Sequence, residues 1–386
     1  MGKFTKSLQG LAVTEDFDAA NLSRITFIAA DLDKTLYPNG MGNATTEPKA
    51  EAKEEWQENI RAYMDFKGHN LLAIPVTGNS PALAQQKFNR SSRELNLTTW
   101  VVQDNPGVFC NGALVLGVNG VVEYSAAVDE KIMKGIQSWA ADGSGFIEVA
   151  GAKYPFCVNC MTKSQVLWLP PKDRNPESKA IADNWASMQL MASGIPDSEH
   201  SWAADPAYQV NLLLKSRAEL SAEFPAWAED FAKEVGNIQT ALLDDLEKCI
   251  GKINDYGYQG KHVIQPWVET NILKSGVNKG QSLNRFIHCE SVRAKLGEID
   301  VGLNVMVAGD AANDLPMFVE WGEVADFNGK KLFQTAKPPV RVIMPDAEDV
   351  NLAAASNVRN KVFEMLDAVV AARRRKHSAL AMVGEM

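Results

Sequence analysis

The sequence predicts an α/β fold in which a parallel-sheet core carries an inserted α+β cap domain. Near both ends of the 386-residue chain, an apolar strand is followed by a short polar segment and then by a helix. This is the pattern of an open α/β sheet. Between residues 125 and 264 this rhythm gives way to tryptophans, prolines and long helical stretches. The chain is also too long for one ordinary core. We therefore expect a discontinuous core of residues 1–124 and 265–386 and a cap of residues 125–264.

The first half of the core is expected to alternate strands and helices. The apolar run Phe27 to Ala30 indicates a strand, and Pro48 to Phe66 carries apolar residues at helical spacing. Leu71 to Val76 is a continuous apolar run, typical of a buried parallel strand. Ser80 can cap a further helix, and Pro81 suits its first turn.

The second half of the core repeats this alternation, while the insertion mixes helices and strands. Asn278 and Lys279 are expected to open a helix, and Val305 to Ala308 forms a short strand. After Pro345 we expect a long helix with four buried positions at four-three-four spacing, namely Val358, Val362, Met365 and Val369. In the insertion we expect helices over Pro176–Ala192 and Ala218–Val235 and a strand over Gln209–Leu214.

The bulk composition excludes some classes of protein. A formal net charge of −9 argues against a general nucleic-acid-binding protein, because affinity for the phosphate backbone comes from clustered Lys and Arg. No apolar stretch is long enough to cross a bilayer, and the N-terminus MGKFTKSLQG lacks the apolar core of a signal peptide. We expect a soluble cytoplasmic protein without a membrane partner, although a targeting peptide that had been removed would leave no trace. The oligomeric state stays open.

The cysteines do not predict a disulfide framework or a zinc site. Their number, five, is odd and favours reduced thiols. Cys157 and Cys160 form a CxxC pair. A structural zinc site needs four ligands, and no second CxxC or paired-His motif follows.

Two aspartates follow the first strand in the segment FIAADLDKTLYPNG. Because side chains alternate along a strand, Asp31 and Asp33 point the same way. Two like charges at this spacing repel each other unless a cation balances them. A surface turn is the alternative reading of DLDKT, since short motifs also occur by chance. If the pair is functional, Asp31 can attack phosphorus, and Asp33 can protonate the leaving oxygen and later deprotonate water.

A second cluster and a single lysine offer groups for a phosphate. Thr77 supplies a hydroxyl and Gly78 a backbone amide just before a helix start, which is a natural anion site. An ordinary helix cap explains Thr77 equally well. Lys279 could offset charge between nucleophile and phosphate, but a lone lysine carries weight only through its position.

The segment GDAANDLPM is the most specific cluster. It places Asp310, Asn313 and Asp314 after a buried strand. Asp310, Asp31 and the backbone carbonyl of Asp33 would provide oxygen ligands for Mg²⁺. Asp314 would orient the site, and Asn313 could reach the phosphate or the nucleophile.

Taken in order, DLDKT, VTGN, the lysine of VNKGQSL and GDAANDLPM resemble the motifs of the haloacid dehalogenase (HAD) superfamily of aspartate-nucleophile phosphatases. The segment GVFCNGALV, which includes Asn111, resembles the Cof-like and sucrose-phosphate-phosphatase-like branch, whose large α/β cap lies between the second and third motifs. The resemblance implies a Rossmann-like parallel-sheet core. It covers about residues 25–118 and 268–344, and the cap is similar only in location and size.

The resemblance implies a role for each motif residue. Asp31 is implied as the nucleophile and Asp33 as the general acid/base. Thr77 and Lys279 are implied as phosphate-binding residues, and Asp310 and Asp314 as carboxylates of a Mg²⁺ site with Asn313 beside them. Together with the side-chain chemistry above, the predicted phosphate-binding residues are Thr77, Gly78, Lys279 and Asn313, and the predicted Mg²⁺ site is formed by Asp31, Asp33, Asp310 and Asp314. Two residues depart from the family pattern: Lys34 replaces the common Gly, and Asn79 replaces the Arg that often follows Thr-Gly. The first could alter the loop, and the second could remove a substrate contact.

These observations predict a Mg²⁺-dependent phosphomonoesterase. The expected substrate is a small, soluble sugar or polyol phosphate, for example a hexitol phosphate such as mannitol-1-phosphate, with the cap closing over it. A phosphomutase of the phosphomannomutase type uses the same aspartate pair and is the first alternative. The second is a non-catalytic protein that binds phosphate and Mg²⁺. A signalling receiver domain is a third, which the large insertion and the Asp31/Asp33 spacing disfavour.

Overall fold

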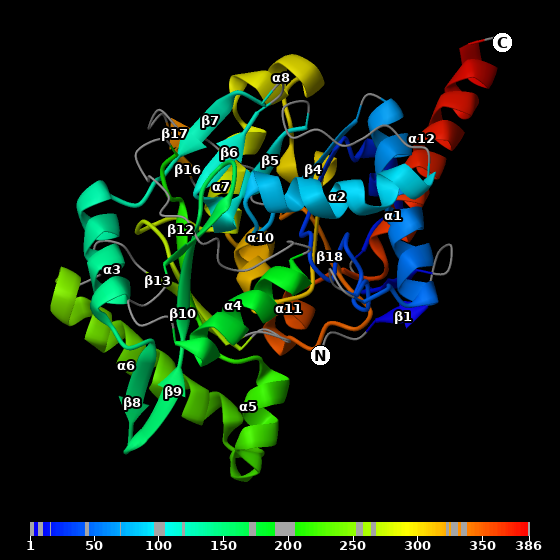
Figure 1. The fold of residues 1–386 in the computed structure, drawn as a ribbon. Helices are drawn as coiled ribbons and strands as arrows, with labels where there is room; N and C mark the ends of the chain where they lie inside the picture. The colour runs from blue at the N-terminus through cyan, green and yellow to red at the C-terminus, as the bar shows by residue number, and fades with distance from the viewer. Residues whose placement is uncertain are drawn as a thin grey trace.

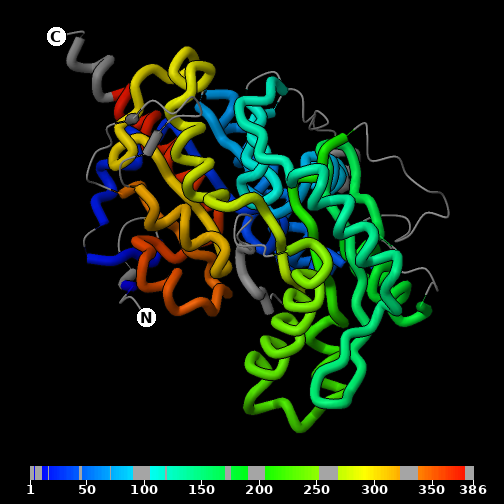
Figure 2. The backbone as a smooth tube through the Cα atoms, turned by 90° about the vertical axis from the view of Figure 1, so that its left-hand side faces the viewer, coloured from blue at the N-terminus to red at the C-terminus, as the bar shows by residue number. Residues whose placement is uncertain are grey.

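The computed structural model describes residues 4–6, 11–15, 17–42, 46–69, 71–95, 105–117, 120–169, 175–189, 205–251, 258–263, 268–321, 324–325, 331–332 and 338–384. The core and the insertion are each built on a separate sheet (Figure 1). Figure 2 shows the core, with its blue, yellow and red backbone, beside the green insertion. None of the helices in these ranges combines the length and apolar character needed to cross a bilayer.

The core is organised around a seven-stranded sheet with the order β1-β2-β19-β18-β15-β3-β4. Five neighbouring strands, from β4 to β19, run parallel, while β2 joins β19 in the antiparallel direction. The strands in sheet order are β1 (Thr5–Lys6), β2 (Ala12–Val13), β19 (Val358–Arg359), β18 (Val340–Ile343), β15 (Val305–Gly309), β3 (Phe27–Ala30) and β4 (Leu72–Pro75). The predicted parallel-sheet core is therefore confirmed.

Helices cover both faces of this sheet because successive strand residues point to opposite sides. From β3, Ile28 and Ala30 pack in one apolar cluster with α1 (Ala50–Gly68), α2 (Pro81–Leu95) and α12 (Val362–Gly384). Phe27 and Ala29 pack in the other cluster, with α7 (Lys279–Ile287), α8 (Glu290–Leu296), α9 (Val301–Asn304), α10 (Leu315–Val319) and α11 (Val350–Ala355). The sheet is thus buried on both faces, as its continuous apolar runs predict.

A small antiparallel sheet leads from the core into the insertion. It has the order β5 (Gly107–Phe109), β6 (Leu114–Leu116) and β7 (Val122–Ser125). A short 3-10 helix, η3 (Cys110–Gly112), connects its first two strands. A parallel bridge between Val76 and Val108 ties it to the end of β4. The remaining short core elements are η1 (Ala19–Arg24), η8 (Ala312–Asp314), β16 (Val324–Ala325) and β17 (Lys331–Leu332).

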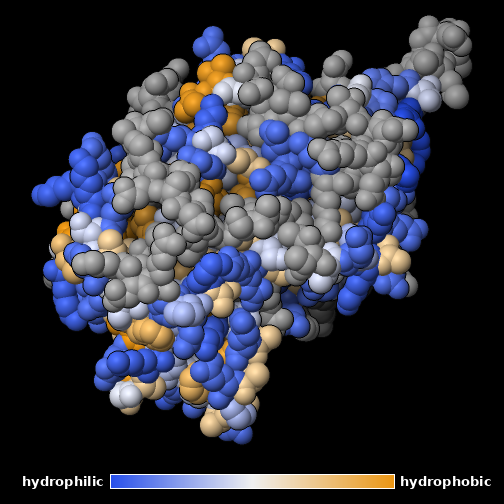
Figure 3. All heavy atoms as spheres, in the orientation of Figure 1, coloured by the Kyte–Doolittle hydropathy of each residue, from blue (hydrophilic) through white to orange (hydrophobic). Residues whose placement is uncertain are grey.

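The insertion is built on a five-stranded antiparallel sheet. Its strands in order are β11 (Val166–Leu169), β10 (Cys157–Met161), β12 (Gln209–Leu213), β14 (Val268–Ile272) and β13 (Tyr258–Val263). One face packs on α3 (Glu130–Asp142) and α6 (Phe231–Ile250), and α4 (Pro176–Met188) packs on the other. The hairpin β8 (Phe146–Val149) and β9 (Ala152–Pro155), α5 (Arg217–Glu223) and η6 (Pro225–Trp227) complete it. Where Figure 3 is coloured, this side of the molecule is largely hydrophilic, with smaller hydrophobic areas between.

Two predicted helices differ from the structure. Val358 lies in β19, not in a helix, because pairing with β18 and β2 satisfies its backbone and overrides the helical spacing. The predicted helix Ala218–Val235 is divided into α5, η6 and α6. Pro225 explains this break, since proline lacks an N–H and cannot sit in a helix interior. In the predicted helix Pro176–Ala192, α4 ends at Met188, and residues 190–192 lie outside the described residues.

The sheet pairing bears on where the insertion ends. β14 pairs with β12 and not with a strand of the core. We therefore propose that the insertion runs to about residue 272 and not to residue 264. The CxxC pair also lies on this sheet: Cys157 belongs to one apolar cluster and Cys160 to the other. Its two thiols thus face opposite sides of β10, a geometry that does not suit one shared metal ion.

Gly280 sets how closely α7 approaches α10. A Cβ atom built on Gly280 would lie 2.2 Å from the carbonyl oxygen of Pro316. Backbone cannot retreat from such a contact as a flexible side chain can, so only glycine fits. This close approach holds Lys279, the first residue of α7, at the ends of the central strands.

We predict that Gly280→Ala destabilises the protein and lowers its activity, because α7 must shift and carry Lys279 with it. Overpacking of this kind costs about 1–3 kcal/mol. Urea unfolding measures the loss. Gly236→Ala in α6 is the matched control: nothing lies within 4 Å of the added atom, so this variant should gain up to about 1 kcal/mol. Equal stability of the two variants would contradict the packing argument.

Candidate active site

Three polar segments meet where neighbouring parallel strands end. Asp31 follows the last residue of β3, and Asp310 follows the last residue of β15. The two strands are in register, with Ala308 opposite Ala30, and the Asp31 N–H donates to the Ala308 carbonyl at 2.9 Å. Thr77 lies just beyond β4, the other neighbour of β3. Ligand sites of open α/β sheets form at this edge.

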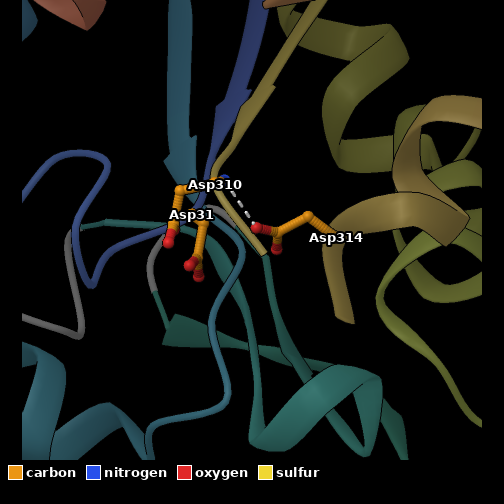
Figure 4. Close-up of side chains that lie close together, drawn as sticks. All are labelled: Asp31, Asp310 and Asp314. Atoms are coloured by element: carbon orange, nitrogen blue, oxygen red, sulfur yellow. Dashed lines mark hydrogen bonds between the residues drawn. The ribbon is translucent and has the colours of Figure 1, made fainter. Parts of the chain in front are cut away.

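Three aspartates form a compact acidic cluster at this edge (Figure 4). Carboxylate oxygens of Asp31, Asp310 and Asp314 all lie within 4.8 Å of one another. The carboxylate of Asp314 comes from the helical segment that follows β15, and its Oδ2 accepts backbone N–H groups of Asp310 and Ala311 at 3.0 and 3.2 Å. The loop GDAAND is thereby folded around its own aspartate. Thr35 donates its hydroxyl to Asp310 at 3.0 Å.

Lys279 is buried against two of these carboxylates. Its Nζ lies 2.8 Å from Asp31 Oδ1 and 2.7 Å from Asp314 Oδ1. Burial opposes the charged form of the lysine, but the two carboxylates outweigh it and raise the pKa of Lys279. When all three carboxyls are ionised, one ammonium among them leaves an excess of two negative charges, since −3 + 1 = −2.

The excess negative charge shows in the pKa values of the cluster. Burial and the neighbouring charge of Asp314 raise the pKa of Asp31 to about 7, against the opposing effect of Lys279. The pKa of Asp310 is raised well above its usual range by burial, by Asp314 and by Asp31. Both carboxyls therefore resist ionisation until a further cation compensates them.

The donor set fits a hard divalent cation. Mg²⁺ prefers carboxylate oxygens and water, and two positive charges would balance the excess. Asp31 and Asp310 are the ligands best placed to hold it, because both oxygens of Asp314 already accept hydrogen bonds. The side chain of Asp33 stands outside the cluster and is held by other groups, so its predicted contribution rests on its backbone carbonyl and stays a prediction.

Asp33 is held by a buried lysine that the sequence reasoning missed. Lys87, from α2, forms an ion pair with Asp33 Oδ1, and Asn79 Nδ2 donates to Asp33 Oδ2 at 2.6 Å. The side chain of Lys87 is only 2% exposed, and its ammonium also lies 5.7 Å from the Tyr37 ring centre. Burial would raise the pKa of Asp33, but the charge of Lys87 and the two hydrogen bonds outweigh it and lower that pKa.

The predicted phosphate-binding residues adjoin the aspartates. Thr77 is buried, and its Oγ1 accepts both the N–H and the side-chain amide of Asn79 at 3.1 Å. Its hydroxyl proton thus remains to be donated to a ligand. Ser80 accepts the Leu83 N–H at 3.3 Å, which confirms the predicted helix cap. Asn313 Nδ2 lies 3.5 Å from Asn111 Oδ1, while its own Oδ1 is buried without a partner.

A cavity of about 420 Å³ lies between these residues and the insertion. The core side includes Asp31, Asp33 and Asp310. The cap contributes Met161, Trp185, Met188, Gln189, Gln209 and Glu269. The six predicted site residues that line this cavity are Asp31, Asp33, Thr77, Gly78, Asp310 and Asn313. Lys279 and Asp314 stand behind Asp31, so the structure brings all eight predicted residues together.

Each departure from the family pattern has a structural counterpart. Lys34 has a φ of 58°, in the left-handed region that glycine adopts most easily. Asn79 directs its amide to Asp33. Lys87 supplies a positive charge to the same carboxylate that Asn79 contacts. A signal for it was present: Lys87 shares the inward face of α2 with Ala84 and Phe88, where a lysine is unexpected.

Comparison with solved structures places the fold. A haloacid dehalogenase-like hydrolase from Bacteroides thetaiotaomicron aligns at a TM-score of 0.53 and 12% identity, over 89% of this chain and 99% of that one. A HAD/COF-like protein from Plasmodium vivax aligns at a TM-score of 0.53 and 13% identity, over 92% of this chain and 99% of that one. A hypothetical protein from Geobacillus kaustophilus HTA426 aligns at a TM-score of 0.50 and 14% identity, over 90% of this chain and 98% of that one.

The fold is therefore that of the haloacid dehalogenase-like hydrolases, with a Rossmann-like core and a large inserted cap. This confirms the predicted fold class and, for the fold alone, the resemblance seen in the motifs. No protein-family model and no curated protein sequence matches the chain.

We predict that Lys87→Met lowers kcat and leaves KM nearly unchanged, because Lys87 contacts Asp33 and orients it. Acid/base catalysis, the role predicted for Asp33, contributes about 10²–10⁴-fold, so losing its orientation should cost about 10–100-fold. Steady-state kinetics with a phosphate monoester measures the effect. Lys134→Met, at an exposed ion pair of α3, is the control. A raised KM with kcat unchanged would instead make Lys87 a substrate-binding residue.

Proposed function

We propose that this protein is a Mg²⁺-dependent phosphomonoesterase that acts through an aspartyl-phosphate formed on Asp31. The observation that carries the proposal is the acidic cluster of Asp31, Asp310 and Asp314 with Lys279 beside a cavity, which would carry two excess negative charges when all three carboxyls are ionised. A surface turn would not bury such a cluster, because uncompensated charge is costly away from water. The proposed substrate is a small sugar or polyol phosphate, for example a hexitol phosphate such as mannitol-1-phosphate.

In the first half of the proposed reaction, the Asp31 carboxylate attacks phosphorus while the bond to the leaving oxygen breaks. Asp33 transfers its proton to that oxygen, and the free alcohol departs. Lys279, the Thr77 hydroxyl, the Gly78 N–H and Asn313 bind the phosphoryl oxygens. A bound Mg²⁺ supplies charge neutralisation between phosphate and carboxylates.

In the second half, ionised Asp33 takes a proton from water, which attacks phosphorus and breaks the bond to Asp31. Inorganic phosphate is released, and Asp33 regains the proton needed for the next cycle. The structure resembles the start of this half, since both oxygens of Asp33 accept from donors and its pKa is lowered. Lys87 and Asn79 support this ionised form.

The cap side of the cavity favours hydrolysis over the phosphomutase alternative. A mutase that returns a phosphoryl group to the sugar must hold a sugar with two phosphates, which calls for cations at both ends of the site. The cap residues that line the cavity, among those the structure describes, include no Lys or Arg. These cap residues suit a neutral leaving group, and the proposed substrate, the binding partner of the protein, is a small phosphate ester.

The proposal is tested by phosphate release from a panel of sugar, polyol, aryl and nucleotide phosphates. We expect hydrolysis with Mg²⁺, loss of this activity when EDTA is added, and recovery of the activity when Mg²⁺ is restored. Free phosphate with no isomeric sugar phosphate supports the phosphatase over the mutase. If no compound of the panel releases phosphate, the result would favour the non-catalytic alternative.

We predict that Asp31→Asn reduces kcat about 10⁴-fold or more, the scale seen when a nucleophile is removed. The amide keeps the shape but lacks the attacking charge. Far-ultraviolet circular dichroism checks the fold. Asp33→Asn is the informative companion, since it should harm alkyl phosphates more than aryl phosphates, whose leaving groups need less protonation. Normal turnover by Asp31→Asn would refute the assignment of the nucleophile.

Mg²⁺ should also stabilise the protein in the absence of substrate. A ligand that binds only the folded state adds about 2.7 kcal/mol at one hundred times its Kd. We expect Mg²⁺ to raise Tm in the wild type and to have little effect on Asp310→Asn, which loses one ligand charge. Differential scanning calorimetry with and without Mg²⁺ measures this, and an equal rise in both proteins would count against Asp310 as a ligand.

A further inference from the structure

A polar stripe crosses the face of the cap sheet that looks toward the cavity. On β12, Gln209 Nε2 donates to Asn211 Oδ1 at 2.7 Å. Asn211 is the register partner of Asn271 on β14, and Asn271 Nδ2 donates to Glu269 Oε1 at 3.3 Å. Gln209 and Glu269 both line the cavity, so the stripe reaches it at each end.

The middle of this stripe is fully buried. Asn159, Asn211 and Asn271 are at most 1% exposed, and Asn159 Oδ1 accepts from Asn211 Nδ2 at 2.8 Å. Two of their polar atoms, Asn159 Nδ2 and Asn271 Oδ1, have no hydrogen-bond partner. Each buried polar atom of this kind costs about 1–3 kcal/mol. A sheet face that keeps such groups sacrifices stability, which points to a use at the cavity.

Glu269 is the charged end of the stripe. It is the only charged residue among the described cap residues that line the cavity. Asn271 and Trp185 hydrogen-bond its carboxylate, and Gln239 Nε2 donates to its backbone carbonyl at 3.0 Å. Burial and the charge of Asp33 raise its pKa to about 6, against the hydrogen bonds from Asn271 and Trp185 and the charge of Lys87, which favour the ionised form. Its carboxylate is therefore a fixed hydrogen-bond acceptor.

Among the described residues that line the cavity, no cation forms an ion pair with Glu269, and only the charge of Lys87 lowers its pKa from a distance. The acidic lining residues of the cavity are Asp31, Asp33, Asp310 and Glu269, and its basic ones, among the residues described, are Lys34 and Lys87. Lys87 is paired with Asp33, and Lys34 lies on the core side near Asp310. A Mg²⁺ ion would offset charge at the aspartate cluster and not at the cap. The leaving-group end of the cavity thus carries one carboxylate, Glu269, beside two glutamine amides and the side chains of Met161, Trp185 and Met188.

We propose that Glu269 selects the leaving group: it accepts hydrogen bonds from the hydroxyls of a neutral polyol or sugar and excludes esters that carry a second phosphate or a carboxylate. This inference rests on the proposed function and names the residue that determines its substrate class. Hydroxyl donors suit a fixed carboxylate, and bonds to a charged acceptor are the stronger kind. A second anion would face Glu269 at low local dielectric, where like charges repel strongly.

The test compares kcat/KM for three probes: mannitol 1-phosphate, p-nitrophenyl phosphate and fructose 1,6-bisphosphate. In Glu269→Gln, the loss on mannitol 1-phosphate should exceed the loss on p-nitrophenyl phosphate by about 10–100-fold, the value of hydrogen bonds to a charged group. Its relative activity on the bisphosphate should rise. Glu229→Gln, at an exposed position of the cap, is the matched control and should behave as the wild type.

Glu269→Asp separates the two parts of the proposal. It keeps the negative charge but retracts the carboxylate by one methylene, so the preference for mannitol 1-phosphate should fall while the bisphosphate stays excluded. Circular dichroism and turnover of p-nitrophenyl phosphate establish that each variant is folded.

Equal losses on mannitol 1-phosphate and p-nitrophenyl phosphate in Glu269→Gln would overturn the inference, because they indicate a structural role only. A wild type that prefers the bisphosphate would overturn it too, while leaving the phosphatase proposal intact. A wild type that hydrolyses none of the probes with Mg²⁺ would refute the proposed function and this inference with it.

Discussion

A buried ammonium shared between two carboxylates is the interaction on which the rest of the site depends. Lys279 lies 2.8 Å from Asp31 and 2.7 Å from Asp314, and all three side chains are at most 8% exposed. Removing one partner of a buried ion pair costs about 3–5 kcal/mol, because the other charge is left uncompensated. The close packing of α7 on α10 at Gly280 and the binding of Asp314 to the loop after β15 serve to keep these groups in place.

The parallel sheet explains how distant segments of the chain form one site. Parallel strands end at one edge of a sheet, so the residues that follow β3, β4 and β15 meet without any long-range signal in the sequence. The cap then covers that edge with a different chemistry. The core side holds aspartates and lysines that suit a phosphoryl group and a metal, while the cap side holds amides, Trp185 and one carboxylate, Glu269.

The core and its motif residues could be predicted because their signals are local. Asp31, Thr77 and Asp310 each follow an apolar strand, and that pattern alone places them at the sheet edge. Lys87 was missed because a lysine in a helix is usually a surface residue. Only its position on the inward face of α2 indicates that it is buried. Glu269 was missed because β14 lies far along the chain from β12, and only their pairing shows that residues 268–272 belong to the cap sheet. Val358 was misplaced because its spacing imitates a helix.

Asn111 connects the two halves of the cavity. With a φ of 50°, it directs its side chain between Gly78 and the cap, and its Nδ2 donates to Gln209 Oε1 at 3.0 Å. The amides of Asn313, Asn111, Gln209, Asn211 and Asn159 thus form a head-to-tail row in which each of the first four NH₂ groups donates to the oxygen of the next amide. Such a row has a direction. Turning any inner amide around would set oxygen against oxygen on one side and NH₂ against NH₂ on the other, so five side-chain orientations are determined together, across the boundary between core and cap.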